Sequence, residues 1–169
     1  MGKYLKIGDI FEVDLENKMK GYVQYIVDDW YQLNSRVIRV FKKKYPFDEH
    51  PEIDEIVRGE IDFYTHVADI KVGEKEGIWK KIGKSEDVGE CNFYFRGTYD
   101  SGMITLDSPN HVSKDWYLWR VGEDPKDVKP NSKLLALSHQ GMIIWPDSIK
   151  ERMITDKYHG FFPKYPGEL

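Results

Sequence analysis

Residues 60–84 read EIDFYTHVADIKVGEKEGIWKKIGK, and this stretch decides the fold class. Apolar and polar side chains alternate from residue 61 to 67, which is the period-two pattern of a β-strand. Two glycines then frame a charged turn, and residues 78–83 return as a second short strand. We therefore predict a hairpin that organises a sheet. Within it, Trp79 is expected to be a half-buried anchor with lysine stems beside it.

Similar alternation on both sides of this stretch predicts further strands. They are expected at residues 10–15, 22–27, 35–41, 92–99, 103–106, 116–121 and 142–145. Turn residues at 100–102 indicate a hairpin between two of them. The strand candidates outnumber every other element in the chain, so the sequence predicts a mainly β protein.

Two short helices interrupt this pattern, at about residues 51–58 and 146–154. Pro51 suits the first helical position and Gly59 a helix end. Ile149 and Met153 form an apolar stripe on the second helix. The fold class expected is α+β, mainly β, with a strongly bent antiparallel sheet or a partly open barrel.

The size and composition of the chain favour one domain over residues 1–169. The 169 residues contain no linker, repeat or low-complexity tract, and 40% of them are hydrophobic. Two prolines and two glycines near the end predict an extended tail over about 156–169.

Charge and cysteine content indicate the compartment and exclude some partners. Cys91 is the single cysteine, so no internal disulfide can form, which fits a reducing compartment. The chain shows no signal-peptide pattern and no apolar run of about 18 residues, so we expect a cytoplasmic protein that does not enter a membrane. A net charge of −4 argues against tight nucleic-acid binding and is compatible with a basic protein partner.

No pattern for catalysis or cofactor binding is present. The sequence lacks GxGxxG, GxxxxGK[ST], HExxH, CxxC and GxSxG, and its five histidines show no metal-ligand spacing. We therefore expect no enzyme activity, no cofactor and no metal.

Several segments resemble, in order and spacing, the immunity protein 26 family of bacterial polymorphic toxin systems. They are KIGDIFEVDL at 6–15, GYVQYI at 21–26, HPEIDEIVRG at 50–59, FYTHVADIKVGEKEGIWKKIGK at 63–84 and IIWPDSIKERM at 143–153. No likeness is evident over about 86–140. The resemblance implies a toxin–antitoxin role, in which the protein binds a cognate toxin, often a nuclease with a basic surface, and blocks its active site without catalysis of its own.

This role directs attention to exposed acidic and aromatic residues, because charge speeds encounter and aromatic anchors supply affinity. The first candidate partner-binding residues are Asp28, Asp29, Trp30 and Tyr31, an acidic-aromatic run expected in a loop. Glu52 and Glu55 on the first helix are a second choice. Helix capping and a solvated face are the competing explanation for Glu52 and Glu55. For residues 28–31, the competing explanation is a solvated loop with Trp30 turned inward.

Two alternatives involve nucleic acid. GDIFEVDL at 8–15 is also similar to the opening of the MazF/PemK-like endoribonucleases, but KGYVQYIV at 20–27 lacks the arginine-proline pair that follows in that family. The broader alternative is a nucleic-acid-binding small β-barrel that uses Lys42–Lys44, Trp79, Lys80 and Lys81. Lysines at a strand end also protect a sheet edge, which is the competing explanation.

Overall fold

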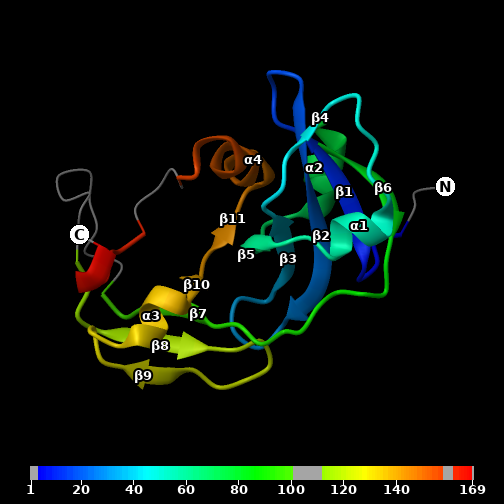
Figure 1. Ribbon diagram of the computed structural model, residues 1–169. Coiled ribbons are helices and arrows are strands. Elements are labelled where there is room, and N and C mark those ends of the chain that lie inside the picture. Colours follow the sequence, from blue (N-terminus) through cyan, green and yellow to red (C-terminus); the bar gives the residue numbers. More distant parts are fainter. Residues whose placement is uncertain (1–3, 101–111, 158–161, 169) are drawn as a thin grey trace. The chain divides into compact units, whose positions relative to one another are not determined.

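Figure 1 shows the computed structural model, which describes residues 4–100, 112–157 and 162–168. The fold class is confirmed: the chain is α+β and mainly β, with mixed sheets that are not closed into a barrel. The chain divides into two compact units, which we call unit 1 (residues 1–90 and 143–158) and unit 2 (residues 91–142 and 159–169). Compact units need not fold alone, so the single domain over 1–169 stays a prediction.

Unit 1 is a seven-stranded sheet with the order β11-β5-β3-β2-β1-β6, and β4 pairs with β2. Its strands are β1 (Asp9–Asp14), β2 (Met19–Asp29), β3 (Ser35–Phe41), β4 (Tyr45–Pro46), β5 (Ile61–Val67), β6 (Trp79–Lys84) and β11 (Ile143–Ile144). All pairs are antiparallel except β11 with β5. The apolar positions that predicted β1 and β3 are buried, as Phe11, Val13 and Ile38 show.

The hairpin predicted within residues 60–84 is wrong. β5 is followed by a helix, α2 (Ile70–Lys75), and β6 then pairs with β1 at the opposite edge of the sheet. The Asp69 side chain accepts a hydrogen bond from the Lys71 backbone N–H at 2.8 Å, which caps α2 and ends the extended run. The connection is therefore a crossover rather than a tight turn.

Trp79 is an anchor, as predicted, but it is fully buried rather than half-buried, and it packs against α2. A Cβ atom on Gly73 would lie 2.2 Å from the Trp79 ring, so only glycine allows the helix to approach this closely. The Trp79 indole N–H donates to the Ile70 carbonyl at 2.9 Å. The contact with Gly73 and this hydrogen bond together attach α2 to β6 at Trp79.

Both predicted helices are confirmed, as α1 (Ile53–Val57) and α4 (Pro146–Thr155). α1 packs its buried residues Ile56 and Val57 on a cluster that includes Tyr22 and Phe41. α4 contacts the other face, where its Met153 meets Gly21. The helices α2 and α3 (Lys133–Leu137) were not predicted.

Unit 2 is a smaller sheet with the order β10-β7-β8-β9. Its strands are β7 (Phe95–Thr98), β8 (Trp116–Trp119), β9 (Lys126–Val128) and β10 (His139–Gln140). Trp116, Leu118 and Leu135 form its core. The predicted strand at 103–106 lies outside the described residues, and so do parts of the predicted tail at 156–169, in which Pro166–Glu168 form a 3-10 turn.

Candidate partner-binding surfaces

The predicted acidic-aromatic run, Asp28 to Tyr31, ends β2 and begins the turn into β3. Asp28 pairs with Arg36 and Asp29 with Ser35 in the β2–β3 register. Trp30 and Tyr31 are 59% and 58% exposed. The structure therefore presents two adjacent aromatic rings at the tip of a hairpin, and Trp30 is not tucked inward.

Asp29 is buried rather than on the surface. Its Oδ2 atom lies 2.8 Å from Nε2 of His66 on β5, and both side chains are fully buried. Its Oδ1 atom accepts a hydrogen bond from the Gln32 backbone N–H at 3.3 Å. Asp29 thus stabilises the conformation of the turn. Because its carboxylate is buried, a partner would not contact it directly.

Asp28 is half-buried and accepts a hydrogen bond from the Tyr25 hydroxyl at 2.5 Å. Burial is the main cause that raises the pKa of Tyr25 to about 12, and the carboxylate of Asp28 adds to it. The Asp28 side chain is therefore held in place on β2 beside the exposed rings.

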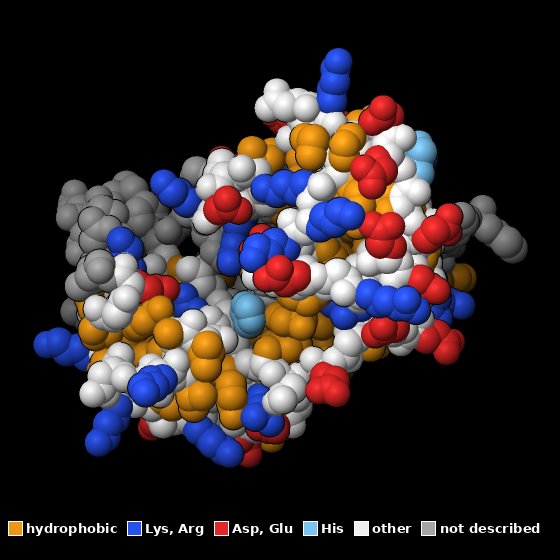
Figure 2. Space-filling view, viewed as in Figure 1, with side chains coloured by type: hydrophobic (Ala, Val, Ile, Leu, Met, Phe, Trp, Pro, Cys, Tyr) orange, Lys and Arg blue, Asp and Glu red, His pale blue; other side chains and the backbone are white. Residues whose placement is uncertain are grey.

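The second choice, Glu52 and Glu55, lies on α1, where Figure 2 shows acidic side chains gathered among lysines and arginines. Glu55 Oε1 accepts hydrogen bonds from Lys43 Nζ at 2.9 Å and from the Tyr45 hydroxyl at 3.0 Å. The Lys43 hydrogen bond is the main cause that lowers the pKa of Glu55. Glu52 is the N-cap residue and makes no side-chain cap hydrogen bond.

The two predicted groups do not meet. The turn lies where β3 begins, at Ser35, whereas α1 packs on Phe41 at the end of β3. A single small contact could not use both, so the structure separates them into two surfaces.

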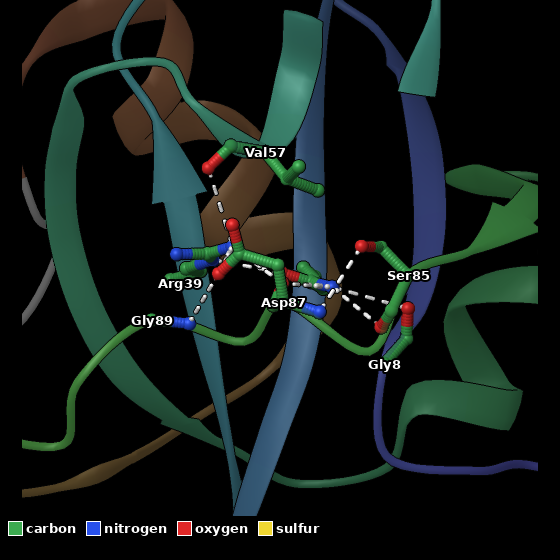
Figure 3. Close-up of polar contacts among 7 residues, drawn as sticks. Gly8, Arg39, Val57, Ser85, Asp87 and Gly89 are labelled. Carbon is green, nitrogen blue, oxygen red and sulfur yellow. Dashed lines mark hydrogen bonds and ion pairs between the residues drawn. The ribbon is translucent and has the colours of Figure 1, made fainter. Parts of the chain in front are cut away.

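A buried polar network that sequence reasoning missed holds the chain after β6 (Figure 3). The Gln24 amide donates to the carbonyls of Gly8, Ser85 and Asp87. Arg39 Nε donates to Gln24 Oε1 at 2.7 Å, and Arg39 Nη2 donates to the Asp87 carbonyl at 2.8 Å. The available signal was a glutamine and an arginine flanked by apolar residues near the middle of two predicted strands.

Most of the residues proposed for nucleic-acid binding are buried or already paired with a carboxylate. Trp79 is buried, so its ring is not available for stacking on a base. Lys42 pairs with Glu60 at 2.8 Å, and Lys81 pairs with Asp9 at 2.7 Å. With Lys43 held by Glu55, most of the predicted basic groups face a carboxylate.

The described residues show neither a metal-binding cluster nor a membrane-spanning helix. Among residues 4–100, 112–157 and 162–168, no group of three or more His, Cys, Asp or Glu side chains is placed to hold a metal ion. Across the same ranges, no helix combines the length and the apolar character needed to cross a membrane.

Comparison with known proteins identifies the family. No curated protein and no solved structure matches the chain. A family model described as immunity protein 26 matches residues 6–99, which is more than half of the chain. The match includes the four N-terminal segments that carried the resemblance, whereas residues 143–153 lie outside it. This chain belongs to the immunity protein 26 family.

Proposed function

We propose that this protein binds a cognate bacterial toxin in the cytoplasm and neutralises it by covering the toxin's active site or substrate groove. The observation that carries the proposal is the family match, because membership implies an immunity protein and is consistent with toxin neutralisation. The same membership suggests a non-catalytic role.

The turn Asp28–Tyr31 is the proposed anchor. Trp30 and Tyr31 offer two large exposed rings on a turn that Asp29 and His66 hold in one shape. Aromatic side chains with a fixed backbone supply affinity at a low entropic cost, which is the usual character of an interface hot spot. A nuclease with a basic surface is the proposed target, since Asp28 and the acids on α1 would then guide encounter.

Co-expression tests the proposal. A toxin gene beside this gene should kill the host when expressed alone and be tolerated when this protein is present. The purified pair should then elute as one complex in size-exclusion chromatography. Death of the host in both cases, with no complex formed, would count against the proposal. An unrelated immunity protein serves as the control for expression burden.

A further inference from the structure

Unit 1 carries a groove that none of the candidate partner-binding residues lines. Three hollows of about 340, 480 and 160 Å³ follow the end of β1, the turn from β1 to β2, and α4. Ile78 lines the first and the second hollow, and Glu16 and Ile154 line the second and the third. Because neighbouring hollows share side chains, we treat them as one groove, the β1 groove.

The lining of the β1 groove includes apolar side chains. Phe47 and Ile154 are 49% and 39% exposed, and Ile78, which lines both of the larger hollows, is partly buried. Exposed apolar side chains within a concavity lose contact with water when a partner covers them, so they favour binding. A flat charged surface lacks this contribution.

The groove is lined by twice as many carboxylates as lysines. The carboxylates are Glu12, Asp14, Glu16, Glu74, Asp147 and Glu151, and the lysines are Lys44, Lys80 and Lys150. Two of these carboxylates already face a lysine: Glu16 Oε1 lies 3.9 Å from Lys150 Nζ, and Glu12 Oε2 lies 3.1 Å from Nζ of Lys20, a buried lysine that does not line the hollows. Even with Lys20 counted, the carboxylates outnumber the lysines, so the groove has an excess of negative charge beside its apolar side chains.

We infer that the β1 groove docks an arginine-containing basic segment of the toxin, an inference that rests on the proposed function. Arginine fits both parts of the groove: its methylene stem packs on apolar surface, and its guanidinium pairs with carboxylates through two parallel hydrogen bonds. Ile78 lines both of the larger hollows, and each of them has carboxylates that suit one basic side chain.

The first experiment uses a tetra-arginine peptide, with tetra-lysine and tetra-glutamate peptides for comparison. Titration followed by backbone amide NMR should shift residues 12–16, 74–80 and 147–155, with tetra-arginine binding several-fold more tightly than tetra-lysine. Tetra-glutamate should not bind, and added salt should weaken the complex. Amide shifts spread equally over all acidic surfaces, α1 included, would overturn the inference.

Matched charge reversals make the test specific. Glu74→Lys combined with Glu151→Lys should weaken peptide binding about tenfold more than Glu76→Lys combined with Glu86→Lys. All four side chains are exposed, and Glu76 and Glu86 do not line the three hollows. Glu74→Gln with Glu151→Gln, which adds no positive charge, should also weaken binding. Equal effects of the groove and control pairs would overturn the inference.

A catalytically inactive form of the toxin separates this inference from the proposed function. If the toxin binds the unchanged protein and both reversed pairs equally well, the groove inference fails and the proposed function stands. If the toxin does not bind the unchanged protein, the proposed function fails. The peptide titration then still shows whether the groove binds an arginine-containing segment. Loss of toxin binding in the groove pair alone supports both.

Discussion

The burial of Tyr25, together with its hydrogen bond to Asp28, makes the acidic-aromatic turn sensitive to alkaline pH. The folded protein raises the pKa of Tyr25 from 10 to about 12, first through burial and then through Asp28. A group whose pKa is raised on folding adds stability that is fully present below its unfolded pKa. That stability is lost as the pH rises through the folded pKa, here from about pH 10 to 12.

Tyr25→Phe should therefore flatten the alkaline limb of the stability profile. Between pH 10 and 12 the unchanged protein should lose about 1–2 kcal/mol more of its free energy of unfolding than the variant. Urea titrations at pH 9, 10, 11 and 12 measure this difference. Other tyrosines with raised pKa, such as Tyr22, are present in both proteins and cancel. Parallel profiles would show that Tyr25 does not carry the effect.

The burial of Asp29 could not be predicted from the sequence. Asp28 and Asp29 are adjacent acids, and nothing local distinguishes the half-buried one from the fully buried one. The distinction comes from His66, which the pairing of β3 with β5 brings beneath the turn. The sequence also did not decide whether Trp30 is exposed, because a loop with this ring turned inward is compatible with the same residues.

Among the secondary-structure elements, the segment after β6 depends on side chains from two strands rather than on a sheet of its own. Gln24 on β2 and Arg39 on β3 together bind the carbonyls of Ser85 and Asp87. Gly89 follows with a φ of +72°, and a Cβ atom there would lie 2.6 Å from Arg39 Nη1. The arginine thus holds this segment of unit 1 against β2 and β3.

Arg39→Met should destabilise unit 1 by about 2–4 kcal/mol, because buried carbonyls and the Gln24 amide oxygen lose their donor. Asp87→Asn is the matched control. Its side chain is 57% exposed and its Oδ1 lies 3.9 Å from Arg39, so we expect a change of less than about 1 kcal/mol. Urea unfolding with an unchanged m-value measures both. Similar losses in the two variants would mean that the ion pair, not the carbonyl contacts, holds the segment.

Strand positions could be predicted from the sequence, but strand partners could not. Alternation shows that residues 61–67 and 79–84 are extended, and both are strands. Alternation does not show that six residues between them form a helix, because α2 is short and contains a glycine. Its cap at Asp69 and the contact of Gly73 with Trp79 depend on the folded arrangement.

For the protein as a whole, two surfaces of unit 1 are proposed to meet the toxin. The acidic-aromatic turn ends β2, and the β1 groove lies near the opposite end of that strand. An 11-residue strand spans about 35 Å, so one partner covering both would need a large interface. The two surfaces are therefore tested separately.

Trp30→Ala should weaken toxin binding at least about 30-fold, since truncating an aromatic hot spot costs about 2 kcal/mol or more. Trp145→Ala is the matched control, because this tryptophan is 60% exposed in the same unit and stands at the start of α4, outside residues 28–31. Isothermal titration calorimetry with the inactive toxin measures both affinities. Equal binding by both variants would remove the turn from the interface and leave the groove as the candidate.

The β1 groove could not be predicted from the sequence, although the fold class could. Its carboxylates come from β1, the following turn, α2 and α4, which are far apart in the sequence. Among 29 acidic residues, none of these stands out by spacing. They form a surface only because β6 crosses to β1 and α4 returns to unit 1, and neither event was evident from the sequence.

The return of α4 to unit 1 also has a consequence for timing during protein synthesis. β11 pairs with β5, and Met153 packs on Gly21, so unit 1 cannot be completed until the ribosome has passed residue 155. At about 5–20 residues per second, translation from β6 to the end of α4 takes about 4–14 s. Under the proposed function, a nascent chain is therefore an incomplete inhibitor for several seconds. A cell that relies on this protein for protection needs a pool of completed molecules before its toxin is translated.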